Sequence, residues 1–68
     1  MEKIKIKTEY IELGQLLKML SIISSGGEAK YYLKENDVFV NNELEDRRGR
    51  KIYPGYNVEV EGKKYQVE

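Results

Sequence analysis

The apolar residues of this chain follow helical spacing in its first half and strand spacing in its second, and this change restricts the folds that it can adopt. Four leucines recur at helical spacing: Leu13, Leu16, Leu17 and Leu20. They predict an amphipathic helix over residues 13–20. Ser25 and Glu28 match the S-x-x-E capping box, which predicts the start of a second helix. Asn36 suits the left-handed conformation that ends many helices, so we expect the second helix to stop there.

Short strands are predicted before and after the helical segment. Residues 3–7 alternate lysine with isoleucine, a pattern typical of a half-buried strand. Further strand segments are predicted at 38–40, 43–44, 57–61 and 64–67. Asn41-Asn42 is expected to form a tight hairpin turn, and turns are also expected at Tyr53-Pro54-Gly55 and Gly62-Lys63. This order of elements predicts an α+β fold in which two helices pack on a small, mostly antiparallel sheet.

The length and composition exclude several classes of protein. A chain of 68 residues forms one domain, residues 1–68, with a thin core. It has no cysteine and no histidine, so it lacks disulfides, thiolate or imidazole metal ligands and the commonest general base. Its carboxylates have no catalytic motif around them, and we expect no catalysis, no metal and no cofactor. No signal peptide or membrane span is recognisable, so we expect a cytoplasmic protein without membrane association.

A dense basic cluster is the strongest local indication of function. It consists of Arg47, Arg48, Arg50 and Lys51, interrupted only by Gly49. Arginine forks bind phosphate oxygens in pairs, so the cluster favours a nucleic-acid backbone as its ligand. The competing interpretation is a solvated loop paired to the neighbouring acids Glu43, Glu45 and Asp46. Surface ion pairs of this kind contribute only about 0–1 kcal/mol, and a polyanion can displace them.

The second predicted helix offers two weaker candidate sites. Ala29, Tyr32 and Leu33 share its inner face, whereas Lys30, Tyr31 and Lys34 share its outer face. The outer face can hold phosphates and stack an unpaired base, although a merely solvated helix face would have the same composition. Ser25, Gly26 and Gly27 leave the first backbone amides of this helix uncovered, which is the arrangement of a phosphate site. The two glycines are equally explained by a tight turn between the helices.

The residues that define these elements also match a family pattern. Eight of them stand where that pattern has its characteristic residues: Leu13, Leu17, Ser25, Ala29, Leu33, Val38, Val40 and Asn41. Pro54-Gly55 stands at the turn before the last core strand. The chain therefore resembles the S-four RNA-binding domain, a small αL-type module first described in a ribosomal small-subunit protein. Its glycine-rich and arginine-rich stretches look like those of the free-standing bacterial members of the YaaA type.

The resemblance implies a non-catalytic module that binds structured RNA, either ribosomal RNA or transfer RNA, as a monomer in a bacterium. DNA stays an open alternative as the polyanion. The sequence departs from the family at Glu12 and Gly26, where arginines are common, and Asn42 and Tyr56 replace a glycine and an aspartate. These departures and the balance of 12 basic against 12 acidic residues favour the alternative function, a protein-interaction adaptor that serves a ribosome-assembly or replication partner.

Overall fold

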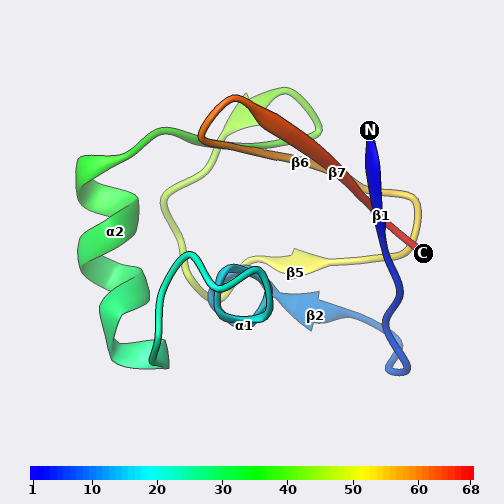
Figure 1. Ribbon diagram of the computed structural model, residues 1–68, viewed down its shortest axis with the longest axis horizontal. Coiled ribbons are helices and arrows are strands. Elements are labelled where there is room, and N and C mark those ends of the chain that lie inside the picture. The colour runs from blue at the N-terminus through cyan, green and yellow to red at the C-terminus, as the bar shows by residue number, and fades with distance from the viewer.

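The computed structural model describes residues 1–68 as two short α-helices and seven short strands (Figure 1). In chain order the elements are β1 (Glu2–Ile4), β2 (Ile11–Glu12), α1 (Leu13–Met19), the 3₁₀ turn η1 (Gly26–Glu28), α2 (Ala29–Glu35), β3 (Val38–Val40), β4 (Glu43–Leu44), β5 (Lys51–Ile52), β6 (Asn57–Val60) and β7 (Lys63–Val67). None of the helices is long and apolar enough to cross a membrane.

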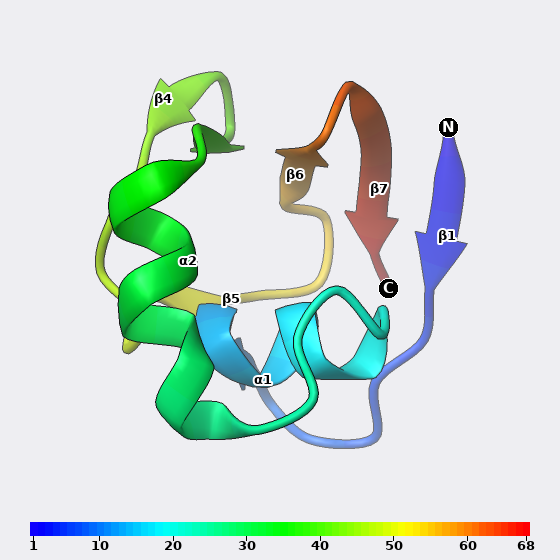
Figure 2. The ribbon, with the colours of Figure 1, turned by 60° about the vertical axis from the view of Figure 1, so that its left-hand side comes forward.

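The strands form two sheets. The larger sheet has five strands in the order β1-β7-β6-β3-β4, with β1 parallel to β7 and every other pair antiparallel. The smaller sheet pairs β2 with β5 in antiparallel fashion. Figure 2 shows α1 at one end of the larger sheet and α2 beside it, so the predicted α+β architecture is confirmed. The small sheet was not predicted, because its two-residue strands pair distant parts of the chain, with Ile11 opposite Ile52.

One hydrophobic core joins the helices to the larger sheet. Its thirteen buried residues are Leu13, Leu16, Leu17, Ile23, Ala29, Leu33, Val38, Val40, Ile52, Val58, Val60, Tyr65 and Val67. The valines alternate along β3 and β6 because successive side chains of a strand point to opposite faces. The leucines of α1 lie on one helical face, as predicted, and Leu20 follows the last helical residue. The spacing of apolar residues was therefore sufficient to identify most of the core.

The second helix begins and ends differently from the prediction. The Ser25 side chain makes no capping bond, and the first turn is the 3₁₀ turn η1. Glu28 instead accepts a hydrogen bond from the Ser24 backbone N–H at 3.1 Å. Two consecutive glycines favour α-helix poorly, which agrees with the tightened turn.

Asn36 was expected to be left-handed, but it is extended, with φ −131° and ψ 143°. Its backbone N–H and its Nδ2 both donate to the Tyr32 carbonyl, at 2.9 and 3.1 Å. That carbonyl therefore has its hydrogen bonds without a left-handed residue, and the chain continues directly into β3.

The turns largely follow the prediction. Asn41 and Asn42 both have positive φ, 51° and 68°, as the hairpin turn requires. Gly55 has φ 95°, and the Tyr56 N–H closes its turn by donating to the Tyr53 carbonyl at 3.0 Å. Several element boundaries differ from the prediction by one or more residues. The last turn is centred on Glu61 and Gly62 rather than on residues 62–63, and the first strand covers residues 2–4 rather than 3–7.

Candidate nucleic-acid interface

The basic segment between β4 and β5 lies against the beginning of α1. The Leu13 N–H donates to the Arg50 carbonyl and the Gly14 N–H donates to the Arg48 carbonyl, each at 2.9 Å. These bonds satisfy two backbone amides at the start of α1, which would otherwise lack partners within the helix. The antiparallel pairing of β2 with β5 adds a second link, because β2 directly precedes α1 and β5 directly follows the basic loop. The loop that carries the arginines is thus fixed to α1 by its backbone.

Gly14 permits this close approach. A Cβ atom at this position would lie 3.3 Å from the Ala29 Cβ and 3.4 Å from the Arg48 carbonyl oxygen. The first distance is tighter than ordinary van der Waals contact, and the second is at its lower limit. The small residue therefore lets three segments meet: the start of α1, the start of α2 and the basic loop.

Glu45 organises the loop from within. Only 5% of this residue is exposed, and its carboxylate accepts bonds from Arg47 Nε at 2.9 Å and from Arg50 Nη1 at 2.7 Å. It also accepts from the Arg47 backbone N–H at 3.0 Å and from Arg47 Nη2 at 3.0 Å. The hydrogen bonds from Arg47, followed by the bond from Arg50, lower the pKa of Glu45 to about 2. The same carboxylate raises the pKa of Arg47 above its usual value.

This arrangement corrects the picture of three equivalent surface acids. Glu43 and Asp46 are exposed and form no ion pair, whereas Glu45 is buried and holds two arginines. Its contact with the backbone of Arg47 shows that the ion pair shapes the loop rather than only neutralising it. The Arg47 side chain nevertheless stays 71% exposed, so its outer edge still faces solvent.

Arg48 lies at a polar hollow that joins three segments. The hollow has a volume of about 350 Å³ and is lined by the basic loop at Arg48 and Gly49, by α1 at Lys18 and by η1 at Gly26. Glu12, Gly14 and Gln15 complete its lining. Neither Arg48 nor Lys18 forms an ion pair within the protein. The structure therefore brings two of the predicted regions, the basic cluster and the glycines before α2, to one hollow.

Lys18 was not singled out from the sequence as a site residue. Helical spacing places Lys18 and Gln15 opposite the leucines, and both are exposed, but an isolated lysine on a solvent face carries no functional indication. Its significance depends on the basic loop beside α1. That contact joins segments about 30 residues apart and has no sequence signature.

Only part of the predicted phosphate site at the start of α2 lines this hollow. Gly26 does so, while Ser25 and Gly27 do not. The Glu28 carboxylate lies close by, and hydrogen bonds from Ser24, through its side chain first and then its backbone, hold the pKa of Glu28 below its ordinary value. This group therefore stays ionised and repels a phosphate near Ser25.

The predicted outer face of α2 is exposed. Lys30 and Lys34 lie in solvent and form no ion pair, and Tyr31 is 65% exposed. These three residues do not line the hollow at Arg48. Tyr31 instead borders a shallow groove that also contains the acids Glu28 and Glu35.

Three tyrosines that the sequence left unassigned form a row beside the basic loop. The ring centroid of Tyr53 lies 5.6 Å from that of Tyr10 and 5.7 Å from that of Tyr56. Lys51 Nζ lies 5.0 Å from the centre of the Tyr10 ring, and the Arg50 guanidinium carbon lies 6.0 Å from that of Tyr56. The basic cluster is therefore continuous with an aromatic surface.

Two comparisons with known proteins bear on this chain. Residues 4–68 match the family described as the S4 domain, which is the S-four domain of the sequence pattern. The chain is also 56% identical over 59 residues to a probable ribosome maturation protein, RlbA, of Bacillus subtilis (strain 168). The matched region covers 87% of this chain and 83% of that protein.

Proposed function

The chain belongs to the S4 domain family, and from this premise we propose that it is a non-catalytic module that binds structured ribosomal RNA during ribosome maturation. The family resemblance supports RNA as the ligand. The similarity to a probable ribosome maturation protein favours ribosomal RNA over transfer RNA and over DNA. Such a role would be exercised in the cytoplasm.

The observation that carries this proposal is the hollow at Arg48. Its two free cations, Arg48 and Lys18, come from different segments, and no carboxylate pairs with either of them. Two backbone bonds to α1 and the buried Glu45 fix the loop before any ligand arrives. A fixed loop loses little conformational entropy on binding, so more of the electrostatic attraction is retained as affinity.

In this proposal the phosphates of one RNA strand contact the exposed edge of the basic cluster. Arg48 and Lys18 bind a phosphate in the hollow, and Arg47, Arg50 and Lys51 attract its neighbours. Lys30 and Lys34 extend the positive surface along α2, and Tyr31 stacks on an unpaired base there. The backbone of residues 25–27 contributes through Gly26, which lines the hollow.

A paired charge reversal tests the proposal. In the variant Lys18→Glu/Arg48→Glu, both changes fall on exposed side chains without ion pairs, so the fold is expected to persist. Arg47→Glu is unsuitable, because it would place a second carboxylate against Glu45. The matched control is Lys63→Glu/Lys64→Glu, which makes the same change of charge on β7, where both lysines are exposed. Figure 2 shows this end of β7 far from α1.

The measurement is the affinity of each variant for bacterial ribosomal RNA, transfer RNA and duplex DNA across a salt series. We expect the wild-type protein to prefer ribosomal RNA, and the Lys18/Arg48 variant to bind it at least about tenfold more weakly, with a salt slope smaller by about 2 because two phosphate contacts are lost. The control should keep the wild-type slope. Equal losses in both variants would show nonspecific attraction and contradict the site. Binding to ribosomal particles without any affinity for their RNA would instead support the adaptor function.

A further inference from the structure

The tyrosine row is not explained by core packing alone. Of its three members only Tyr56 packs against the hydrophobic core, and all three side chains are half-buried. Tyr10 precedes β2, whereas Tyr53 and Tyr56 flank the turn at Pro54-Gly55, so the fold brings together rings that are more than 40 residues apart in sequence. Tyrosines that keep part of their rings in solvent are available to a ligand.

Cations adjoin both ends of this row. Lys51 lies by the Tyr10 ring and Arg50 by the Tyr56 ring. Lys51 is exposed and has no carboxylate partner, so it can move from the ring to a phosphate. Proteins hold unpaired nucleotides with rings and neighbouring cations, because the rings stack on bases while the cations bind the backbone.

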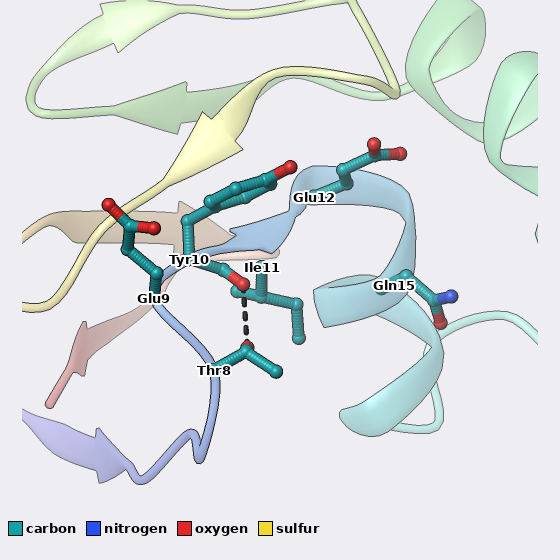
Figure 3. Close-up of a pocket in the computed structure, with 6 residues that line it drawn as sticks. All are labelled: Thr8, Glu9, Tyr10, Ile11, Glu12 and Gln15. Carbon is teal, nitrogen blue, oxygen red and sulfur yellow. Dashed lines mark hydrogen bonds between the residues drawn. The ribbon is translucent and has the colours of Figure 1, made fainter.

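Tyr10 also lines an open hollow between β2 and α1 (Figure 3). The hollow has a volume of about 590 Å³, which is within the usual range of ligand sites. Figure 3 shows the Tyr10 ring between the carboxylates of Glu9 and Glu12, with Gln15 on the adjacent helix. The two carboxylates can accept hydrogen bonds from the exocyclic amines of bases. The hollow is thus suited to a base, and the neighbouring cations are suited to its phosphate.

The Tyr10 hollow adjoins the phosphate-binding hollow at Arg48. Glu12 and Gln15 line both of them. An RNA strand held at Arg48 and Lys18 therefore has the Tyr10 ring on the neighbouring surface. We infer that the Tyr10 hollow binds an unpaired, amine-bearing base of the RNA, stacked on the Tyr10 ring beside Lys51. This inference rests on the proposed function, because it requires that RNA binds at the basic loop.

The test compares two single-stranded probes that differ only in their bases. One is the RNA hexamer of adenosine, and the other is an abasic hexamer with the same phosphates. The variant Tyr10→Leu removes the ring, and Tyr10→Phe is the matched control that keeps it. Thermal unfolding establishes that both variants are folded.

We expect Tyr10→Leu to bind the adenosine hexamer about 5- to 100-fold more weakly, the range that stacking of one base supplies, and the abasic hexamer as the wild type does. Tyr10→Phe should bind both probes as the wild type does. The wild-type protein should also prefer the adenosine hexamer to a uridine hexamer, because uracil has no exocyclic amine.

NMR on the unmodified protein gives a second measurement that no folding defect can affect. The adenosine hexamer should shift the ring signals of Tyr10 and Tyr53, while those of the buried Tyr65 should not move. Equal affinity of the wild-type protein for the adenosine and abasic hexamers, or unmoved Tyr10 signals, would overturn the inference. If ribosomal RNA still binds through Arg48 in that case, the proposed function stands without it. If the protein binds neither ribosomal RNA nor the adenosine and abasic hexamers, the inference and the proposed function are both overturned.

Discussion

The substitution Glu45→Gln tests whether the buried carboxylate organises the basic loop. Glutamine has nearly the same shape and can still accept one hydrogen bond, but it loses the charge that Arg47 and Arg50 share. In the folded protein the pKa of Glu45 falls from 4.5 to about 2. A shift of one unit corresponds to about 1.4 kcal/mol, so the ionised carboxylate contributes at most about 3.5 kcal/mol to the free energy of unfolding.

The expected loss is smaller than this limit. The Arg47 side chain is 71% exposed, so solvent screens part of its attraction to Glu45. We therefore expect Glu45→Gln to lower the free energy of unfolding by about 2 kcal/mol at pH 7. For a domain of this size, a loss of that order lowers Tm by roughly 8–16 °C.

The pH dependence has a definite sign. Because the folded pKa lies below the unfolded value, the stabilisation is fully present above about pH 4.5 and is lost as the pH falls toward 2. The difference in the free energy of unfolding between wild type and Glu45→Gln should therefore become smaller as the pH is lowered through this interval. Urea unfolding between pH 3 and pH 7 measures it.

Glu43→Gln provides the matched control, because Glu43 is an exposed acid two residues away without an ion pair. Glu43→Gln should lower the free energy of unfolding by less than about 0.5 kcal/mol. If Glu45→Gln lowers the free energy of unfolding no more than Glu43→Gln does, or if this loss does not change with pH, the buried ion pair does not stabilise the loop.

Two further substitutions test other contacts. Tyr32 donates to the Glu61 carboxylate at 2.6 Å, and burial, followed by this bond, raises the pKa of Tyr32 to about 12. Tyr32→Phe should lower the free energy of unfolding by about 1 kcal/mol at pH 7. Because the folded pKa of Tyr32 is raised, the stabilisation by its hydroxyl is lost as the pH rises from 10 to 12. Urea unfolding above pH 10 should therefore show a smaller difference in stability between the wild type and Tyr32→Phe. Gly14→Val should lower the free energy of unfolding by about 1–3 kcal/mol, because the valine side chain would collide with Ala29 and the Arg48 carbonyl. It should also weaken binding to ribosomal RNA in the salt-series assay described above. An unchanged Tm would refute the close packing at Gly14.

The elements whose evidence lies within a few neighbouring residues were predictable. The leucines of α1 and the valines of β3 and β6 have the spacing of their elements, and the Asn41-Asn42 turn has residues that tolerate positive φ. The errors fall at element ends. At Ser25 and Asn36 several local hydrogen-bond patterns compete, and the contacts of Ser24 and Tyr32 decided between them.

The candidate site was predicted only in outline. Its cations were evident as the run at residues 47–51, and Lys30 and Lys34 were correctly expected in solvent. The sequence did not distinguish Glu45 from its neighbouring acids, because burial depends on where the loop packs. Nor did it join Lys18 to Arg48 or Tyr10 to Tyr53, since those neighbours are brought together by long-range contacts.

The sequence by itself determined the class of fold, most of the core residues and the location of the basic segment, because hydrophobic periodicity and charge are properties of the chain. The tertiary structure alone decided which charges are free and which rings face them. The reason is the packing of the loop on α1, where two backbone hydrogen bonds, the small Gly14 and the buried Glu45 combine to set the position of the basic loop.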